Sequence, residues 1–220
     1  LGVCPVAVGG LDDDGAGGGR SRARQEHRVV GPAEVAGEEH ARGVGLDEHA
    51  LRTPPDWPYD EAERDALLRA GGVPDPVLMN CSGKHAAMLA VCVAQGWPLD
   101  DYRAPEHPLQ QQLRGTLERL AGEPVSAVGV DGCGAPVGAL SLTGVARAFS
   151  AAVQAEPGSA ERAVADAMRE HPVHVGGHGR DVTRLMQGVP GLLAKDGAEG
   201  VFAIALDDGR ALALKVEDGA

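Results

Sequence analysis

The order of the predicted elements assigns this chain of 220 residues to the α+β class. Helical patterns fill residues 60–170, and the segment 192–216 has the pattern of antiparallel strands. No internal repeat is visible. Residues 1–43 are rich in glycine and charge and lack an apolar period, so we expect poor order there; a misplaced start or a shift of reading frame would look the same. The sequence therefore predicts one α+β domain over residues 44–220.

The composition excludes several classes of protein. Hydrophobic residues make up 43% of the chain and charged residues 24%, a balance typical of globular proteins. The formal net charge of −12 argues against nucleic acid as a partner, because phosphate binding needs concentrated positive charge. No stretch of about 18 apolar residues occurs, so we expect no membrane span. Four irregularly spaced cysteines do not form a disulfide framework, and we expect a reducing, cytoplasmic location.

Three helices are predicted in the first half of the domain. Asp60 supplies the N-cap of a helix that runs to about Ala70, where two glycines follow. A second, apolar helix covers 85–95 and ends at Gly96. The third covers roughly 107–120, where leucines recur every three or four residues. This stripe of leucines indicates that the third helix packs on a core.

The second half of the domain is predicted to contain both strands and helices. Residues 127–130 form a short buried strand that leads into a glycine-rich turn, and two helices follow at 140–155 and 160–170. The remaining predicted strands are 192–195, 200–206 and 210–216, the last two joined by a tight turn at 207–209. No predicted element follows the last strand to cover its sheet face.

The strongest local signal is the run NCSGKH at residues 80–85. Cys81 and Lys84 lie three residues apart at a turn that leads into a helix, where an ammonium group and the positive end of a helix both favour a thiolate. A thiolate is a nucleophile and also a soft metal ligand. The alternative is a small core cysteine beside a solvated lysine, and the polar neighbours Ser82 and His85 weigh against it.

A second signal is the run DGCGAP at residues 131–136. It follows a predicted strand, and its two glycines let the backbone bend closely around Cys133. Together with a third ligand, Cys81 and Cys133 could hold one zinc ion. Two cysteines so far apart in the sequence are weak evidence for a metal by spacing alone, and a tight turn with an inert thiol is the alternative.

Other candidate residues carry weaker signals. Cys92 lies within an alanine- and valine-rich helix, where core packing is its expected role. His171, His174 and His178 are close enough in sequence to suggest a metal site, but two glycines between them indicate a mobile loop instead. Lys195 ends a predicted strand, so it either projects into a cleft or belongs to a turn.

Four runs occur in an order that resembles one known family: NCSGKHAAML (80–89), DGCGAP (131–136), HPVHVGGHGR followed by LM (171–186) and AKDGAEGVFAIAL (194–206). Over about 44–219 the chain is similar to the Rhizobium-type L-asparaginases, the asparaginase II protein family. The resemblance implies an incomplete version of the fold of serine β-lactamases and penicillin-binding proteins, an antiparallel sheet flanked by helices. It also implies a hydrolase that converts the small molecule L-asparagine to L-aspartate and ammonia, and it is compatible with a homodimer.

The resemblance also implies roles for individual residues. Carried over residue by residue, it implies a zinc site made of Cys81, Lys84 and Cys133. Lys84 and Ser82 are expected to contact the substrate. Lys195 stands where the family has the lysine of one of its two Ser–Lys pairs, which implies a catalytic role. The implied reaction is acyl transfer: a serine attacks the side-chain amide, a neutral lysine takes its proton, and water hydrolyses the acyl-enzyme.

Two serine-containing stretches of the family have no counterpart in this sequence. The family's nucleophile lies in an R-S-S-x-K-P stretch and the serine paired with the lysine at position 195 in an S-H-S-G-E stretch, and residues 1–43 contain neither. The family also continues beyond the stretch at 215–219, so the chain resembles a fragment. We expect an impaired asparaginase; the alternative is an inactive zinc-binding remnant of that fold. A penicillin-recognising protein is disfavoured because Ser-x-x-Lys and K-T-G runs are absent.

Overall fold

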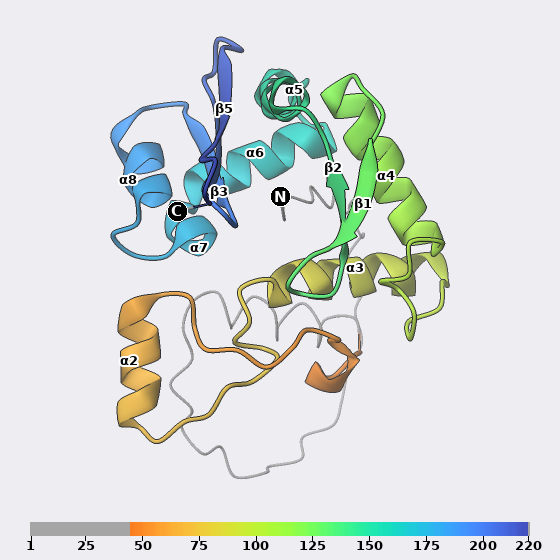
Figure 1. The fold of residues 1–220 in the computed structure, drawn as a ribbon, viewed down its shortest axis with the longest axis vertical. Helices are drawn as coiled ribbons and strands as arrows, with labels where there is room; N and C mark the ends of the chain where they lie inside the picture. Colours follow the sequence, from red (N-terminus) through yellow and green to blue (C-terminus); the bar gives the residue numbers. More distant parts are fainter. Residues whose placement is uncertain (1–44, 220) are drawn as a thin grey trace.

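The computed structural model describes residues 45–219 and combines helices with two antiparallel sheets, which confirms the α+β class. Figure 1 shows a three-stranded sheet between helices and a separate two-stranded ribbon. The poor order predicted for residues 1–43 lies outside the described residues, and the specific likeness to serine β-lactamases stays a prediction. Within residues 45–219, no helix has both the length and the apolar character that a membrane crossing needs.

The helices begin and end where the sequence provides caps. Ser141 and Ser159 accept N–H groups of the first turns that follow them, and Gly96 and Gly122 adopt the left-handed conformation that ends a helix. The elements in chain order are the short 3-10 helix η1 (Glu48–Ala50), helices α2 (Glu61–Arg69), α3 (Ser82–Gln95) and α4 (Pro108–Ala121), strands β1 (Ala127–Val130) and β2 (Pro136–Ala139), helices α5 (Leu142–Gln154), α6 (Ala160–Glu170), α7 (Pro172–Gly176) and α8 (Asp181–Gly188), and strands β3 (Leu193–Gly197), β4 (Val201–Ala205) and β5 (Ala211–Lys215).

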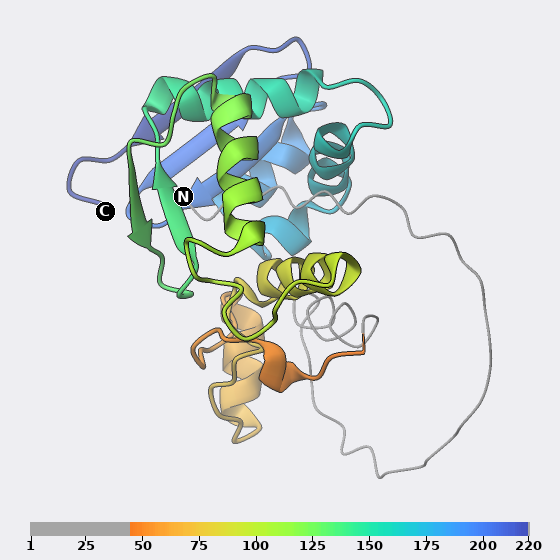
Figure 2. The same ribbon diagram turned by 90° about the vertical axis from the view of Figure 1, so that its right-hand side faces the viewer.

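Strands β3, β4 and β5 form an antiparallel meander close to the predicted positions. On one face Ala203 and Ala205 are fully buried under α5. Their small side chains let the helix approach closely, and α5 fills the space with Val145, Phe149 and Val153, which are spaced about one helical turn apart. Helix α5 also packs against α4 (Figure 2). The sheet and the middle helices therefore share one apolar layer.

The segment after α6 is helical, which corrects the expectation of a mobile loop at residues 171–178. On the second face of the sheet, Val182 and Met186 of α8 pack with Ala194 of β3. Their spacing of one turn places both side chains on the same side of the helix. The glycines that suggested a loop form the corner between α7 and α8, where Gly177 has a φ of 86°.

A separate core lies between α3, α4 and the loops that connect them. It contains Met88, Leu89 and Cys92 of α3, Leu109 of α4 and Tyr102 of the intervening loop, all almost completely buried. The predicted packing role of Cys92 is confirmed. Helix α3 begins three residues earlier than predicted, so the NCSGKH run enters its first turn, where backbone N–H groups carry partial positive charge.

The strand predicted at residues 127–130 is present as β1, but it is exposed rather than buried. It pairs with β2, which sequence analysis missed, in a ribbon where Ala127 lies opposite Ala139 and Val130 opposite Pro136. A two-stranded ribbon has few neighbours to cover it, so Val130 stays 79% exposed. Proline and glycine concealed β2, because both residue types are depleted in strands. The turn of this ribbon carries Cys133.

Asp60 links α2 to the corner before α8. Its carboxylate accepts the N–H groups of Ala62 and Glu63 in the first turn of α2. The same carboxylate accepts the backbone N–H of His178 at 2.8 Å and lies 2.9 Å from Nδ1 of that ring. Burial opposes the charge, but the hydrogen bonds from His178 and from the helix outweigh it and lower the pKa of Asp60 to about 2.

We expect Asp60→Ala to lower the free energy of unfolding by about 2 kcal/mol at neutral pH. A carboxyl with a depressed pKa stabilises the fold above its unfolded pKa, near 4, and this contribution is lost as the pH falls through about 2. Urea unfolding near pH 7 and near pH 3 should therefore show that the wild type and Asp60→Ala differ less in unfolding free energy at the lower pH. Asp60→Asn keeps a hydrogen-bond acceptor for the helix and should lose less unfolding free energy than Asp60→Ala. A loss in Asp60→Ala that does not change with pH would argue against this account.

Candidate functional site

The turn between β1 and β2 lies against the start of α3, and this contact brings two distant cysteines together (Figure 1). The sulfurs of Cys81 and Cys133 and a carboxylate oxygen of Asp131 lie within 4.8 Å of one another. Cys133 is buried, Cys81 is partly buried, and neither forms a disulfide. We refer to these three residues and Lys84 as the thiol cluster.

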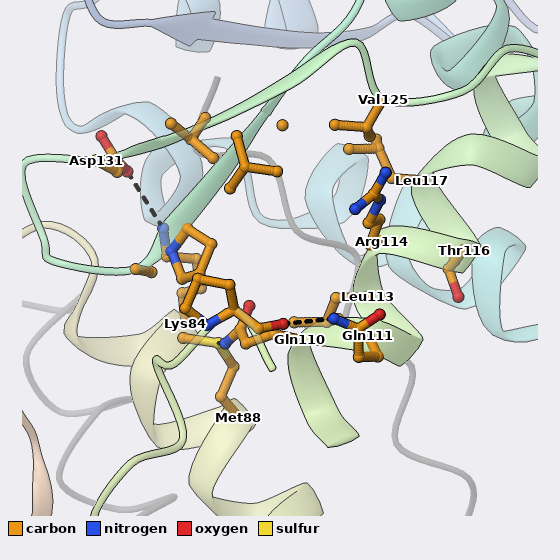
Figure 3. A pocket seen from close by; sticks show the side chains of 16 residues that line it. Lys84, Met88, Gln110, Gln111, Leu113, Arg114, Thr116, Leu117, Val125 and Asp131 are labelled. Atoms are coloured by element: carbon orange, nitrogen blue, oxygen red, sulfur yellow. Dashed lines mark hydrogen bonds and ion pairs between the residues drawn. The ribbon is translucent and has the colours of Figure 1, made fainter. Parts of the chain in front are cut away.

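Lys84 lies between the acidic groups of the thiol cluster. Its Nζ is 3.4 Å from the sulfur of Cys133. The same Nζ is 3.5 Å from a carboxylate oxygen of Asp131 (Figure 3). Only 15% of the Lys84 side chain is exposed. Burial alone would lower the pKa of Lys84, but the attraction of Cys81, then of Cys133 and Asp131, outweighs burial and raises it. The metal-free cluster therefore holds an ammonium group.

The two thiols of the cluster shift each other's pKa in opposite directions. The hydrogen bond between Cys81 and Cys133 is the largest influence on both: it lowers the pKa of Cys133 to about 2 and raises the pKa of Cys81 far above its usual range. Burial opposes the Cys133 thiolate, whereas His85 and Lys84 stabilise it further. Of the two thiols, Cys133 is therefore the more acidic.

The donor atoms of the thiol cluster suit zinc. Zinc sites are usually tetrahedral with zinc–sulfur distances near 2.3 Å, so two sulfurs on one ion lie about 3.8 Å apart. The separation of at most 4.8 Å between the sulfurs of Cys81 and Cys133 is compatible with this geometry after a small adjustment. Lys84 could coordinate only as a neutral amine. Asp131 offers an oxygen at the same place; sequence analysis did not select it, although it stands at a strand end two residues before Cys133.

A cavity of about 110 Å³ opens beside the thiol cluster, between α4 and the β1–β2 ribbon (Figure 3). Lys84 and Asp131 lie together at one end of it. The other lining residues are mainly apolar, with a few amide, hydroxyl and guanidinium groups: Met88, Pro105, Gln110, Gln111, Leu113, Arg114, Thr116, Leu117, Val125, Val128, Ala135, Pro136, Val137 and Gly138. A small ligand in this cavity would meet both charges at the same end.

Ser82 lines a different cavity from Lys84. Its side chain is 3% exposed and borders a hollow of about 90 Å³ that Asp60, His174 and His178 also line. The structure therefore does not bring Ser82 and Lys84, both expected at the substrate, into one cavity. His178 contacts Asp60, and within residues 45–219 the thiol cluster supplies the only group of three metal-binding side chains close enough to share an ion.

Lys195 lies on β3 and contacts its neighbour in sequence. Its Nζ donates to the carboxylate of Asp196 at 2.6 Å and to the carbonyl oxygen of the same residue at 2.7 Å. The other carboxylate oxygen accepts from Arg180 at 2.7 Å. Burial opposes the charge of Asp196, but Lys195 and Arg180 together lower its pKa. Among the described residues, no hydrogen bond joins Lys195 to the thiol cluster.

Gly134 shapes the turn that carries Cys133. Its φ is 81°, and a Cβ atom there would lie 2.2 Å from a guanidinium nitrogen of Arg103. That guanidinium group donates to the carbonyl oxygen of Arg52 at 2.5 Å, so moving it breaks a hydrogen bond. The turn therefore needs a residue without a side chain at this position.

We expect Gly134→Ala to lower the free energy of unfolding by about 1–2 kcal/mol, because left-handed backbone is unfavourable for alanine. The neighbouring Gly132→Ala is the matched control, since its φ is not positive and its Cβ would meet no atom within 4 Å. Urea unfolding measures both variants. Equal losses in the two would show that neither the φ of Gly134 nor its contact with Arg103 matters.

Comparison with known proteins assigns the chain to a family. A search of curated proteins finds no match. The family model for L-asparaginase II matches residues 37–220, a range that includes the thiol cluster and Lys195. This match covers well over half of the sequence. The chain therefore belongs to the L-asparaginase II family.

Proposed function

We propose that the chain is an L-asparagine amidohydrolase whose thiol cluster binds zinc through Cys81, Lys84 and Cys133. The observation that carries the proposal is the convergence of these side chains, from two distant segments, beside a cavity with a charged end. Family membership supports an asparaginase-type reaction. The finer likeness to the fold of serine β-lactamases belongs to the same proposal.

The charges of the thiol cluster complement an amino-acid substrate. Asparagine carries an ammonium group, a carboxylate and a neutral side-chain amide. Asp131 suits the first of these, and the positive charge of bound zinc, in place of the ammonium group that Lys84 carries without the metal, would suit the second. Bound zinc would supply a Lewis acid able to hold an oxygen atom of the substrate. Ser82 would reach a substrate only from the neighbouring cavity. Lys195 would exchange a proton after releasing the carboxylate of Asp196.

A nucleophile activated by lysine is not found among the described residues. The sequence has only three lysines, and none of them donates to a serine within residues 45–219: Lys84 contacts the thiol cluster, Lys195 contacts Asp196, and Lys215 donates to a backbone carbonyl. Without the nucleophile, binding and electrostatics retain only a small part of an enzyme's rate. We therefore expect slow turnover by this chain. The same observation favours the second candidate, an inactive zinc-binding remnant.

Ammonia release from L-asparagine by the purified chain, with and without zinc, tests the proposal. An impaired asparaginase gives slow turnover that Cys133→Ser abolishes and Cys92→Ser leaves unchanged, since Cys92 is not part of the group of metal-binding side chains. A remnant binds zinc but releases no ammonia. Turnover at the full rate of an enzyme would refute the impairment, and a chain with neither turnover nor zinc binding would refute the proposal.

A further inference from the structure

His85 and Tyr102 form a buried pair beside the thiol cluster that the proposed chemistry does not use. Both side chains are completely buried. Nδ1 of His85 lies 2.5 Å from the hydroxyl oxygen of Tyr102, and the rings meet edge to face. The backbone N–H of His85 donates to the carbonyl oxygen of Cys81 in the first turn of α3. The pair is therefore attached to the same turn that carries the cluster.

The second partner of the Tyr102 hydroxyl fixes the direction of its hydrogen bond to His85. The backbone N–H of Arg52 donates to the hydroxyl oxygen at 3.3 Å. The hydroxyl has one hydrogen of its own, and Nδ1 is the only acceptor given for it within the described chain. Leaving a buried hydroxyl hydrogen without an acceptor costs about 1–3 kcal/mol. Tyr102 therefore donates to Nδ1, and a neutral His85 carries its hydrogen on Nε2.

The second ring nitrogen of His85, Nε2, remains available to the thiol cluster. Nε2 is buried and has no hydrogen-bond partner among residues 45–219. Tyr102 and Cys133 pack in the same buried cluster, and the His85 side chain lowers the pKa of the Cys133 thiol. Polar groups that hold metal ligands in place from the second layer commonly change metal affinity by about 10–100-fold. An unpartnered N–H beside a ligand sulfur has the chemistry for this role.

We propose that Tyr102 is a positioning residue for the thiol cluster: it fixes the tautomer of His85 with the hydrogen on Nε2, and this N–H supports the Cys133 sulfur during zinc binding. The inference rests on the proposed zinc site. It assigns no step of the reaction to Tyr102 or His85. It gives the buried pair of His85 and Tyr102 a role beside the thiol cluster.

The tautomer can be read directly in the full chain. Long-range ¹⁵N–¹H correlation spectra of histidine-labelled protein distinguish a hydrogen on Nε2 from one on Nδ1, and His85→Gln identifies the signals of His85. We expect the Nε2 form in the wild type, with and without zinc, and a mixture in Tyr102→Phe. Thr53→Val is the matched control, because Thr53 is also a buried hydroxyl, bonded to the carbonyl oxygen of Pro76 at 2.9 Å and away from His85.

Zinc affinity supplies the second measurement, by competition with a chromophoric chelator. We expect Tyr102→Phe to bind zinc about tenfold more weakly and Thr53→Val within about twofold of the wild type. A hydrogen on Nδ1 of wild-type His85 overturns the inference even where zinc binds tightly. Unchanged affinity in Tyr102→Phe also overturns it. If the wild type does not bind zinc, the proposed metal site is wrong. The spectrum of the metal-free protein still shows which nitrogen of His85 carries the hydrogen.

Discussion

Cys133→Ser is expected to weaken zinc binding by at least about 100-fold, because it removes the thiolate ligand itself rather than a group that supports one. Zinc present at about 100 times its dissociation constant stabilises a protein by about 2.7 kcal/mol. The variant should lose nearly all of this stabilisation. Competition with a chelator gives the affinity, and thermal unfolding with and without zinc gives the stabilisation.

Cys92→Ser is the control for this prediction. Cys92 is as buried as Cys133 but packs in the core between α3 and α4, outside the thiol cluster. The control should therefore lose some stability and keep its zinc affinity. If both serine variants bound zinc as the wild type does, the cluster would not be the metal site.

Lys84→Met is expected to cost about 3 kcal/mol or more of unfolding free energy in the metal-free chain at neutral pH, because it leaves buried anionic groups without their cation. The Cys133 thiolate has a pKa of about 2, far below that of an unfolded thiol. Its contribution to stability therefore grows as the pH rises toward the unfolded thiol pKa, and is lost as the pH falls through the folded value. Lys84 lowers the pKa of Cys133 less than Cys81 does, so without Lys84 this pH dependence should become shallower rather than disappear.

Urea unfolding of the metal-free proteins between about pH 5 and 8 measures this slope. The ultraviolet absorbance of thiolate, taken as the difference from Cys133→Ser, reports the charge of Cys133. Lys215→Met is the control, since Lys215 donates only to the carbonyl oxygen of Val216 on the surface. We expect the difference between the wild type and Lys84→Met to increase with pH and Lys215→Met to follow the wild type. A constant difference would mean that Lys84 acts by packing alone.

Local patterns in the sequence predicted the elements whose signals are strong. Asp60 and the glycines at 96 and 122 delimit helices through caps, which depend on neighbouring residues only. Strand β2 and helices α7 and α8 were missed because Gly138 and Gly177 conceal elements that tertiary packing stabilises. The prediction that β1 is buried was wrong for a related reason. The exposure of a strand depends on which other elements cover it, and the four residues of the strand do not reveal this.

Some residues of the candidate site could be predicted from the sequence and others could not. Local chemistry singled out Cys81, Lys84 and Cys133, and the family resemblance grouped them as one site; these residues do lie together. Asp131 and Tyr102 were not selected, because their importance arises from contacts between segments that are distant in the sequence. A strand end two residues before a cysteine could have pointed to Asp131. No local signal distinguishes Tyr102 from an ordinary core residue.

The central claim, that two thiols and an amine from distant segments form one zinc site, is tested most directly by zinc K-edge X-ray absorption of the zinc-loaded chain. The account predicts two sulfur neighbours at about 2.3 Å and nitrogen or oxygen neighbours at about 2.0–2.2 Å. Cys133→Ser should reduce the sulfur count to one. A first shell made only of nitrogen and oxygen in the wild type would contradict the account.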